Sequence, residues 1–218
     1  YRFIFIPETI GSISYIYRNL NRLKNNVLAI INLTCVGDSR KTSFLPTKYQ
    51  NTFLDKIIFN YFKSKKIKFS KYNWSKRGSD ERQYMSALIN IPTISIMSSK
   101  YHTYKEYHTS KDDLNFISIK GLNKNYQIHK NIINIIDKSR FPISKIYCEP
   151  NLGKRNLYPK KSLFKKKEEK KLSKNLLSFL SFSDGTNTLE DISNYCKFTK
   201  KYNMKIYKIL NKHNLINK

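Results

Sequence analysis

Two short stretches of the sequence carry residue types that could perform metal-assisted chemistry. Glu8 ends an apolar run and is followed by a Gly-Ser pair at residues 11–12, where a helix could begin. His108 lies a hundred residues later, in a Tyr-His-Thr-x-x-Asp sequence that ends at Asp112. Such a turn suits a metal-bound imidazole with a fixed tautomer. A carboxylate and a histidine on strand-end loops of one sheet are typical of a zinc hydrolase.

Both carboxylates also have simpler explanations that the sequence leaves open. Glu8 could do no more than stabilise the N-terminus of the helix that follows it. Asp112 could do no more than cap its own turn. The metal interpretation is stronger for Glu8 because the His108 motif accompanies it in the same chain.

The bulk composition bounds the class of protein. With 218 residues and 25.9 kDa, the chain has room for one ordinary domain and a small one, and 39% hydrophobic residues argue against disorder throughout. No apolar run has the length of a membrane span, so we expect no membrane partner. Three scattered cysteines argue against a disulfide framework and predict a cytoplasmic protein.

The formal net charge of +27 would by itself indicate nucleic acid or another anionic partner. However, the basic residues are mostly lysines, mixed with many asparagines and isoleucines, which share AT-rich codons. Arginine, which nucleic-acid sites favour for its bidentate fork, is scarce. Codon bias is therefore the preferred explanation of the charge, and nucleic acid is a partner that the sequence permits but does not favour.

The order of apolar segments predicts an α/β fold with a mostly parallel sheet and helices on both of its faces. Residues 1–6 read as a strand buried on both faces. The further expected elements are strands within residues 27–36 and 89–97, and helices at residues 12–24, 51–64 and 124–137.

A lysine-rich break separates a second, smaller domain. We expect a catalytic-type domain at residues 1–160, a lysine-rich linker at 161–172 and a winged-helix domain at 173–218. Thr188 and Asp191 are spaced almost as in a capping box, which predicts a helix start. No helix of this domain shows clustered arginines or amides on one face, so packing or self-association is favoured over DNA binding.

Five motifs, taken together, resemble those of a bacterial family: the aminopeptidase-like zinc proteins that end in a winged helix, distant relatives of the co-catalytic zinc aminopeptidases (clan MH). The motifs occur in the family's order and span nearly the whole chain. They stand at residues 5–12 (FIPETIGS), 35–38 (CVGD), 78–84 (GSDERQY), 106–110 (EYHTS) and 148–155 (CEPNLGKR).

The resemblance implies a zinc cofactor and roles for several residues. His108 is similar to the last zinc ligand, and Asp112 would brace its turn. Glu8 is similar to the strand-end glutamate that binds metal or takes a proton from metal-bound water. Thr34 stands where relatives with two zinc ions have an aspartate ligand, so a single zinc ion is expected, with Asp38 as a substitute ligand.

The loop at residues 78–84 is expected to orient the substrate, a peptide or a related amide. Asp80 or Glu81 could hold a free amino group and Arg82 a carboxylate, with Tyr84 beside them. The same residues could equally form a salt-bridged surface turn.

The chain begins with Tyr1 inside the expected first strand, and the family's earlier histidine and aspartate ligands lie upstream of the Glu8 motif. The resemblance therefore implies the C-terminal part of a zinc-dependent hydrolase, inactive by itself because its other metal ligands precede it. Two alternatives stay open: a non-enzymatic nucleic-acid-binding protein that uses the winged helix and the lysine-rich linker, and an inactive truncated fragment. The sequence does not fix whether the chain forms homo-oligomers.

Overall fold

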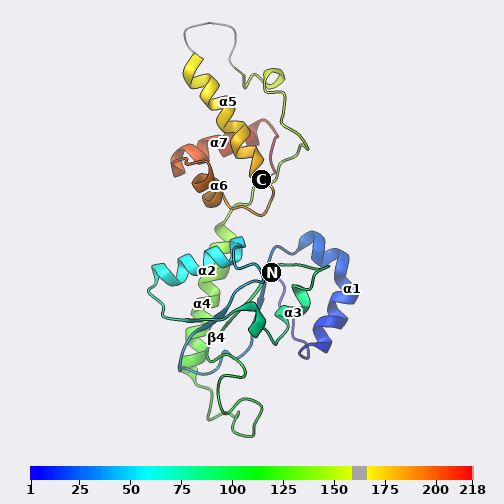
Figure 1. Cartoon of the computed structure of the whole chain (residues 1–218), viewed down its shortest axis with the longest axis vertical. Coiled ribbons are helices and arrows are strands. Elements are labelled where there is room, and N and C mark those ends of the chain that lie inside the picture. Colours follow the sequence, from blue (N-terminus) through cyan, green and yellow to red (C-terminus); the bar gives the residue numbers. More distant parts are fainter. Residues whose placement is uncertain (159–165, 218) are drawn as a thin grey trace. The chain divides into compact units, whose positions relative to one another are not determined.

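The structure is a computed structural model that describes residues 1–158 and 166–217 (Figure 1). The chain divides into two compact units, Tyr1–Asp137 and Lys138–Lys218. The division thus comes earlier than the predicted domain boundary at residue 160. The predicted linker at 161–172 lies partly outside the described residues, and its second half begins helix α5 (Lys166–Ser181).

The first unit contains a four-stranded sheet with the strand order β1-β4-β2-β3. Two of its three pairings are parallel, β1 with β4 and β2 with β3, whereas β2 and β4 are antiparallel. This confirms the predicted α/β fold with a mostly parallel sheet. The strands are short: β1 (Ile30–Asn32), β2 (Ser43–Leu45), β3 (Ser70–Lys71) and β4 (Thr93–Met97).

Both faces of this sheet are covered, as the burial of every residue of the central strand β4 shows. On one face, Phe44 of β2 makes edge-on ring contacts with Phe59 and Phe62 of helix α2 (Phe53–Ser64). On the other face, Ser95 of β4 donates to Glu81 at the start of helix α3 (Glu81–Tyr84). Successive side chains of a strand point to opposite faces, which places these two contacts on opposite sides.

Helices α1 (Ile10–Asn26) and α4 (Ile119–Lys138) confirm two predicted helices and extend each at its start. Ile16 and Leu23 of α1 are buried with Tyr84 and Ile91. The pattern that predicted this helix was the helical spacing of Ile13, Ile16, Tyr17 and Leu20, of which Ile16 is buried.

The predicted strand at residues 1–6 is wrong. The structure assigns no strand there, and Tyr1, Phe3 and Phe5 expose 83%, 74% and 93% of their surface. An apolar run becomes a buried strand only where another strand offers backbone partners. Among the described residues, no strand pairs with this segment.

The single tryptophan of the chain, Trp74, also belongs to this first unit. It begins the short 3₁₀ helix η1 (Trp74–Lys76) and is half-buried. The guanidinium carbon of Arg77 lies 5.5 Å from the centre of the indole ring.

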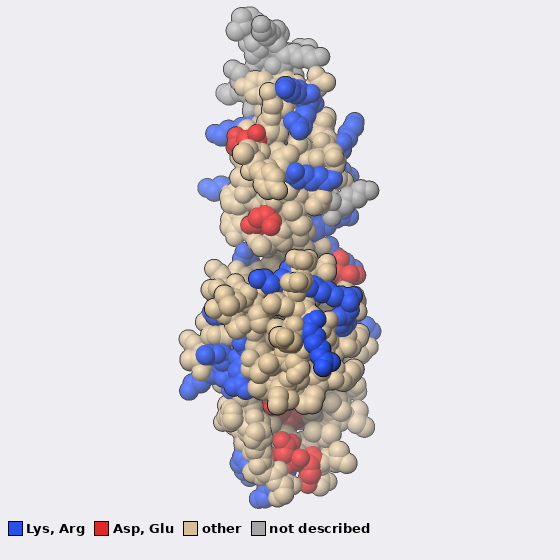
Figure 2. All heavy atoms as spheres, turned by 90° about the vertical axis from the view of Figure 1, so that its right-hand side faces the viewer, with Lys and Arg blue, Asp and Glu red and all other residues tan. Residues whose placement is uncertain are grey.

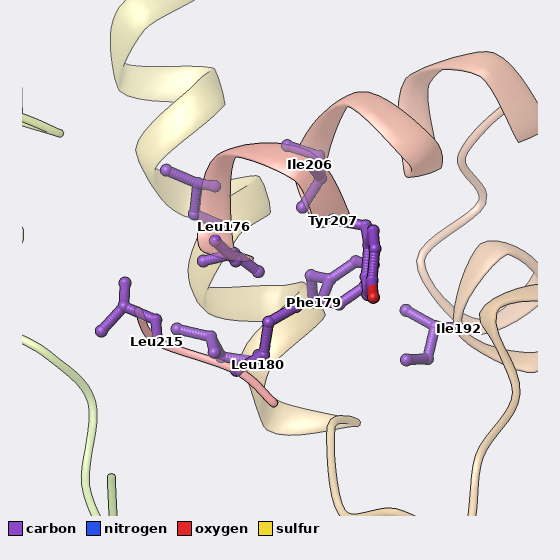
Figure 3. Close-up of a cluster of buried hydrophobic side chains, with 9 residues drawn as sticks. Leu176, Phe179, Leu180, Ile192, Ile206, Tyr207 and Leu215 are labelled. Atoms are coloured by element: carbon purple, nitrogen blue, oxygen red, sulfur yellow. The ribbon is translucent and has the colours of Figure 1, made fainter. Parts of the chain in front are cut away.

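The second unit has its own hydrophobic core, made where helices α5, α6 (Leu189–Tyr195) and α7 (Lys200–Lys212) meet (Figure 3). Phe179 of α5, Ile192 of α6 and Ile206 of α7 are fully buried in it. Thr188 and Asp191 form the predicted capping box at the start of α6. A further short 3₁₀ helix, η2 (Gly153–Arg155), precedes α5. Across the described residues of both units, no helix is long and apolar enough to cross a membrane.

Candidate active site at the carboxyl edge of the sheet

A pocket of about 450 Å³ lies in the first unit, beyond the carboxyl ends of β1 and β4. The loop after β1 contributes residues 34–38 to its wall, and the loop after β4 contributes residues from Tyr101 to Asp112. Because β1 and β4 are parallel neighbours, both loops leave the sheet at the same edge. Open α/β sheets place their ligand sites at this edge.

The structure brings Glu8 and His108 together in this pocket, as the sequence predicted, and places Asp112 in its wall. All three side chains are exposed to solvent. Glu8 reaches the pocket from the segment just before α1, so it does not depend on the strand that was predicted for residues 1–6. Burial raises the pKa of Tyr107, and the nearby Glu8 carboxylate raises this pKa further. Glu8 therefore lies close to the ring that stacks on His108.

The imidazole of His108 is held by its neighbours in the same loop. The Tyr107 ring stacks on it with centroids 3.9 Å apart and planes 15° apart. His102 lies edge-on to Tyr107 at 4.7 Å and to His108 at 6.3 Å. His108 has a φ of 56°, which is uncommon for a residue other than glycine.

Two more residues around the pocket share this unusual backbone conformation. Thr9, next to Glu8, has a φ of 62°, and Cys35, in the loop after β1, has a φ of 50°. Such conformations persist only where the surroundings enforce them, and they are found preferentially at functional sites. Three separate segments around the pocket thus each contain a residue with this uncommon φ.

Asp38, the predicted substitute ligand, also lines the pocket, but its carboxylate is almost fully used. Oδ1 accepts from the backbone N and Nε of Arg40 and from Ser99 Oγ, at 2.9, 3.3 and 3.1 Å, and Oδ2 accepts from the backbone N of Ser99 at 2.9 Å. Burial by itself would raise the pKa of Asp38, but these hydrogen bonds outweigh it and lower the pKa. The carboxylate of Asp38 therefore has little remaining capacity to bind a metal ion.

Arg40 is a residue that the sequence did not single out. Its guanidinium pairs with Asp38 and, through Nη1, with Glu106 at 3.3 Å. The same group lies 4.5 Å from the ring centre of Phe116 and 5.3 Å from that of Tyr104. Arg40 thus ties the loop after β1 to the loop that carries His108.

Asp80 and Arg82 contact the Glu8 segment. Asp80 Oδ1 accepts from the backbone N of Thr9 at 2.7 Å, and Arg82 Nη2 donates to Thr9 Oγ1 at 2.8 Å. Neither residue lines the pocket. Both bonds fix the turn that presents Glu8.

Glu81 is completely buried. Oε1 accepts from the backbone N of Gly78 and Ser79 and from Tyr101 Oη, at 2.9, 3.0 and 2.9 Å. Oε2 accepts from Asn32 Nδ2 at 3.0 Å and from Ser95 Oγ at 3.2 Å. A carboxylate without exposed surface cannot meet a substrate amino group, so its contribution is to hold β1, β4 and the loop at residues 78–80 together.

Tyr84 points away from the pocket, toward α1. It is buried against Ile16 and Leu23, and its hydroxyl accepts from Ser12 Oγ at 3.5 Å. Burial raises the pKa of Tyr84. It therefore supports the helix that follows Glu8.

The aromatic wall of the pocket was not foreseen. Tyr104 and Phe116 stack with centroids 5.1 Å apart and planes 13° apart, and both line the pocket with Tyr101 and Tyr107. Burial, together with a hydrogen-bond partner in Cys35 at 3.5 Å, raises the pKa of Tyr104. The segment that leads to His108 has tyrosines at positions 101, 104 and 107, which was a signal for this wall in the sequence.

The donor set of the described residues does not fit a complete zinc site. No three His, Cys, Asp or Glu side chains among residues 1–158 and 166–217 are placed to share one metal ion. Glu8 and His108 could supply two donors, whereas catalytic zinc is held by three protein ligands. A zinc ion would thus need at least one ligand beyond those described.

The fold belongs to the class of aminopeptidase-like α/β proteins. Its structure superposes on BSAP, a zinc aminopeptidase from Bacillus subtilis, with a TM-score of 0.50 over 60% of this chain and 34% of that protein. The identity of 15% shows a shared fold and nothing further. The chain belongs to the protein family described as "Domain of unknown function (DUF4910)", whose sequence model matches residues 1–139. Residues 141–218 match a winged helix-turn-helix, which confirms the predicted winged-helix fold but begins before the expected residue 173.

Two relatives from Clostridium acetobutylicum are more similar in sequence. One is provisionally named a polysaccharide biosynthesis protein with an aminopeptidase-like domain. It is 38% identical over 159 residues, which cover 72% of this chain and 36% of that protein. The other is a crystal structure provisionally described as a peptidase, with 31% identity and a TM-score of 0.60 over 97% of this chain and 46% of that one. The chain thus spans less than half the length of each relative.

Proposed function

We propose that this chain forms part of an aminopeptidase-like hydrolase that cleaves a peptide or a related amide, with Glu8 and His108 as its site residues. The observation that supports the proposal is the convergence of these two side chains, a hundred residues apart, in one pocket at the carboxyl edge of the sheet. The aminopeptidase-like fold agrees with this chemistry but does not by itself establish it.

In this proposal, Glu8 acts as the general base. Its carboxylate is exposed in the pocket beside an aromatic ring, where it can accept a proton from a water molecule that attacks the amide. Asp80 and Arg82 position Glu8 by fixing the backbone and hydroxyl of Thr9. Their substitution should therefore lower the rate more than it weakens substrate binding.

His108 is proposed as one ligand of a zinc ion, completed by donors outside the described residues. Zinc, when bound, acts as a Lewis acid that polarises the substrate carbonyl. The stack with Tyr107 fixes the plane of the imidazole before any ligand arrives.

The test is zinc binding by the full chain, measured by equilibrium dialysis for the variants His108→Asn and His102→Asn. Asparagine tolerates the left-handed backbone conformation that both histidines adopt, so the two variants carry matched strain. We expect the wild type to bind zinc weakly and His108→Asn to lose this binding. His102→Asn should still bind zinc, because His102 does not line the pocket. Equal zinc binding by the wild type and both variants would contradict the assignment of His108.

A third variant, Glu8→Gln, separates base from ligand. If Glu8 is the base, this variant should bind as much zinc as the wild type. In a complete protein that hydrolyses N-terminal residues from a peptide, Glu8→Gln should lower the rate of hydrolysis by about 10²-fold or more. Loss of zinc binding in Glu8→Gln would instead make Glu8 a ligand.

A further inference from the structure

One segment of the first unit, residues 63–77, is strongly basic. Seven of its fifteen residues are basic and none is acidic, whereas the whole chain has 42 basic and 15 acidic residues among 218. The basic residues of the segment are Lys63, Lys65, Lys66, Lys68, Lys71, Lys76 and Arg77. All seven are exposed. A codon bias raises the lysine content along the whole chain, so it does not account for this local concentration.

An excess of basic side chains alone does not mark a site. Basic side chains outnumber acidic ones on the face of the molecule that Figure 2 shows, in keeping with the composition. The segment at residues 63–77 differs because its charge is uncompensated: among the described residues, none of its seven basic side chains forms an ion pair. The acidic residues nearest to it in the sequence, Asp55 and Asp80, accept instead from the backbone N of Thr47 at 2.8 Å and of Thr9 at 2.7 Å.

The fold holds this segment in place. It runs from the end of α2 through the edge strand β3 to the 3₁₀ helix η1. The backbone N of Tyr72 donates to the O of Phe44 in β2 at 2.9 Å, and the rings of Phe69 and Phe62 pack with centroids 4.7 Å apart. The exposed charges are therefore carried by a backbone that the sheet and the aromatic core anchor.

An indole ring lies among these charges. Trp74 is half-buried in η1, and Arg77 Nη1 donates to its backbone O at 3.3 Å. The guanidinium carbon of Arg77 stays 5.5 Å from the centre of the indole ring. Asn73 Oδ1 caps η1 by accepting from the backbone N of Ser75 at 2.9 Å. An aromatic ring beside basic side chains can stack on an unpaired base while the charges neutralise phosphates.

We propose that residues 63–77 bind single-stranded nucleic acid without reading its sequence. The lysines are complementary to phosphate and lack the bidentate fork that selects a base. Trp74 stacks on one base, and every base has a face that can stack, so this contact also tolerates any sequence. None of the seven basic residues lines the pocket of Glu8 and His108, so the proposal is independent of the proposed hydrolase.

The experiment is a salt titration of the full chain with fluorescently labelled oligo(U) and oligo(C) of about 15 nucleotides, followed by anisotropy. The patch variant changes Lys63, Lys65, Lys68 and Lys71 to glutamine. The control variant changes Lys41, Lys105, Lys120 and Lys130 to glutamine. These control lysines are exposed in the same unit, lie outside residues 63–77 and remove the same charge.

We expect equal affinity for the two oligonucleotides. In the patch variant, affinity near 0.1 M salt should fall more than about tenfold, and the slope of log K against log salt should flatten by up to about 2.8, at about 0.7 per phosphate contact. The control variant should change both quantities far less. Unchanged circular dichroism and melting would show that the patch variant folds.

A third variant, Trp74→Leu, tests the stacking contact. It should weaken the binding of oligo(U) about fivefold or more without changing the salt slope, because it removes a base contact and no phosphate contact. Its binding of inorganic polyphosphate, which has no bases, should equal that of the wild type.

Four outcomes would overturn the proposal. Equal losses in the patch and control variants would mean that the overall charge alone attracts the polymer. Full affinity in a folded patch variant would place the binding elsewhere. Unchanged binding of oligo(U) by Trp74→Leu would leave a surface that binds any polyanion. Displacement of oligo(U) by polyglutamate of equal charge would indicate an acidic protein partner instead.

Discussion

At the scale of single residues, the acidic side chains of the first unit divide by what surrounds them. Glu8 is exposed in the pocket and free to react, whereas Glu81 is buried among five neutral donors. A buried carboxylate keeps its charge only when hydrogen bonds replace the lost water. The same residue type is therefore accessible to a ligand in one place and structural in the other.

Asp38 should make the stability of the first unit sensitive to acid. Its pKa is lowered in the folded state, so its contribution is present above its unfolded pKa, about 3.9, and is lost as pH falls through the lower, folded pKa. Asp38→Asn should cost about 1–3 kcal/mol at pH 7, because an amide cannot accept all the bonds of the carboxylate. Urea unfolding between pH 7 and pH 2 measures both effects.

The difference in stability between the wild type and Asp38→Asn should begin to shrink as pH falls below about 4 and should continue to shrink down to the folded pKa of Asp38. Asp113→Asn is the matched control, since Asp113 is exposed and bonds only within its own turn. A stability difference that stays constant down to pH 2 would rule out the linkage to Asp38.

The residues of the site were predictable only in part. Glu8 and His108 were expected at one site because both were assigned to strand-end loops of one sheet and because their motifs resemble those of one family. Three of the partners of Glu81 come from residues 32, 95 and 101, and such long-range contacts leave no local pattern. Glu81 was expected to contact a substrate, and only the three-dimensional structure shows that its carboxylate is buried and holds several segments together.

At the scale of the elements, α4 approaches the pocket closely because of a glycine. A Cβ atom on Gly121 would lie 2.2 Å from the backbone O of Gly37 and 2.6 Å from the backbone of Asp38. Real Cβ contacts are longer, and neither neighbour is a flexible side chain that could yield. The loop that lines the pocket thus rests directly on this helix.

Gly121→Ala should displace the loop at residues 37–38 and destabilise the first unit by about 1–3 kcal/mol, as overpacking does. Gly153→Ala is the matched control, because its added Cβ would meet only the side-chain end of Asn151, at 3.2 Å. Chemical denaturation of the two variants measures the difference. A Gly121→Ala protein as stable as the control would show that the helix can shift without cost.

The helices were easier to predict than the strands. Helices α2, α4 and α7 carry apolar residues at helical spacing over three turns or more, which gives a clear signal. Strands β2 and β3 have three and two residues, too few for an alternation to emerge, and both were missed. The apolar run at residues 1–6 has the composition of a strand but no partner strand in the part of the chain that the structure describes, which composition cannot reveal.

At the scale of the whole molecule, each unit has a core of its own. The nine buried residues at the centre of the second unit all come from residues 176–216. We expect residues 138–218 to fold alone, with a helical circular dichroism spectrum and a single cooperative thermal transition. Chymotryptic resistance of the same fragment provides an independent check, and a fragment that melts without cooperativity would contradict the expectation.

Trp74, half-buried beside Arg77 in the first unit, makes the two units optically distinct. Indole emission can come only from that unit, because the chain contains one tryptophan. The emission therefore reports on the first unit, while ellipticity from α5, α6 and α7 includes the second. A fluorescent label is thus already present in the natural sequence, and each unit's response to denaturant can be followed in one cuvette.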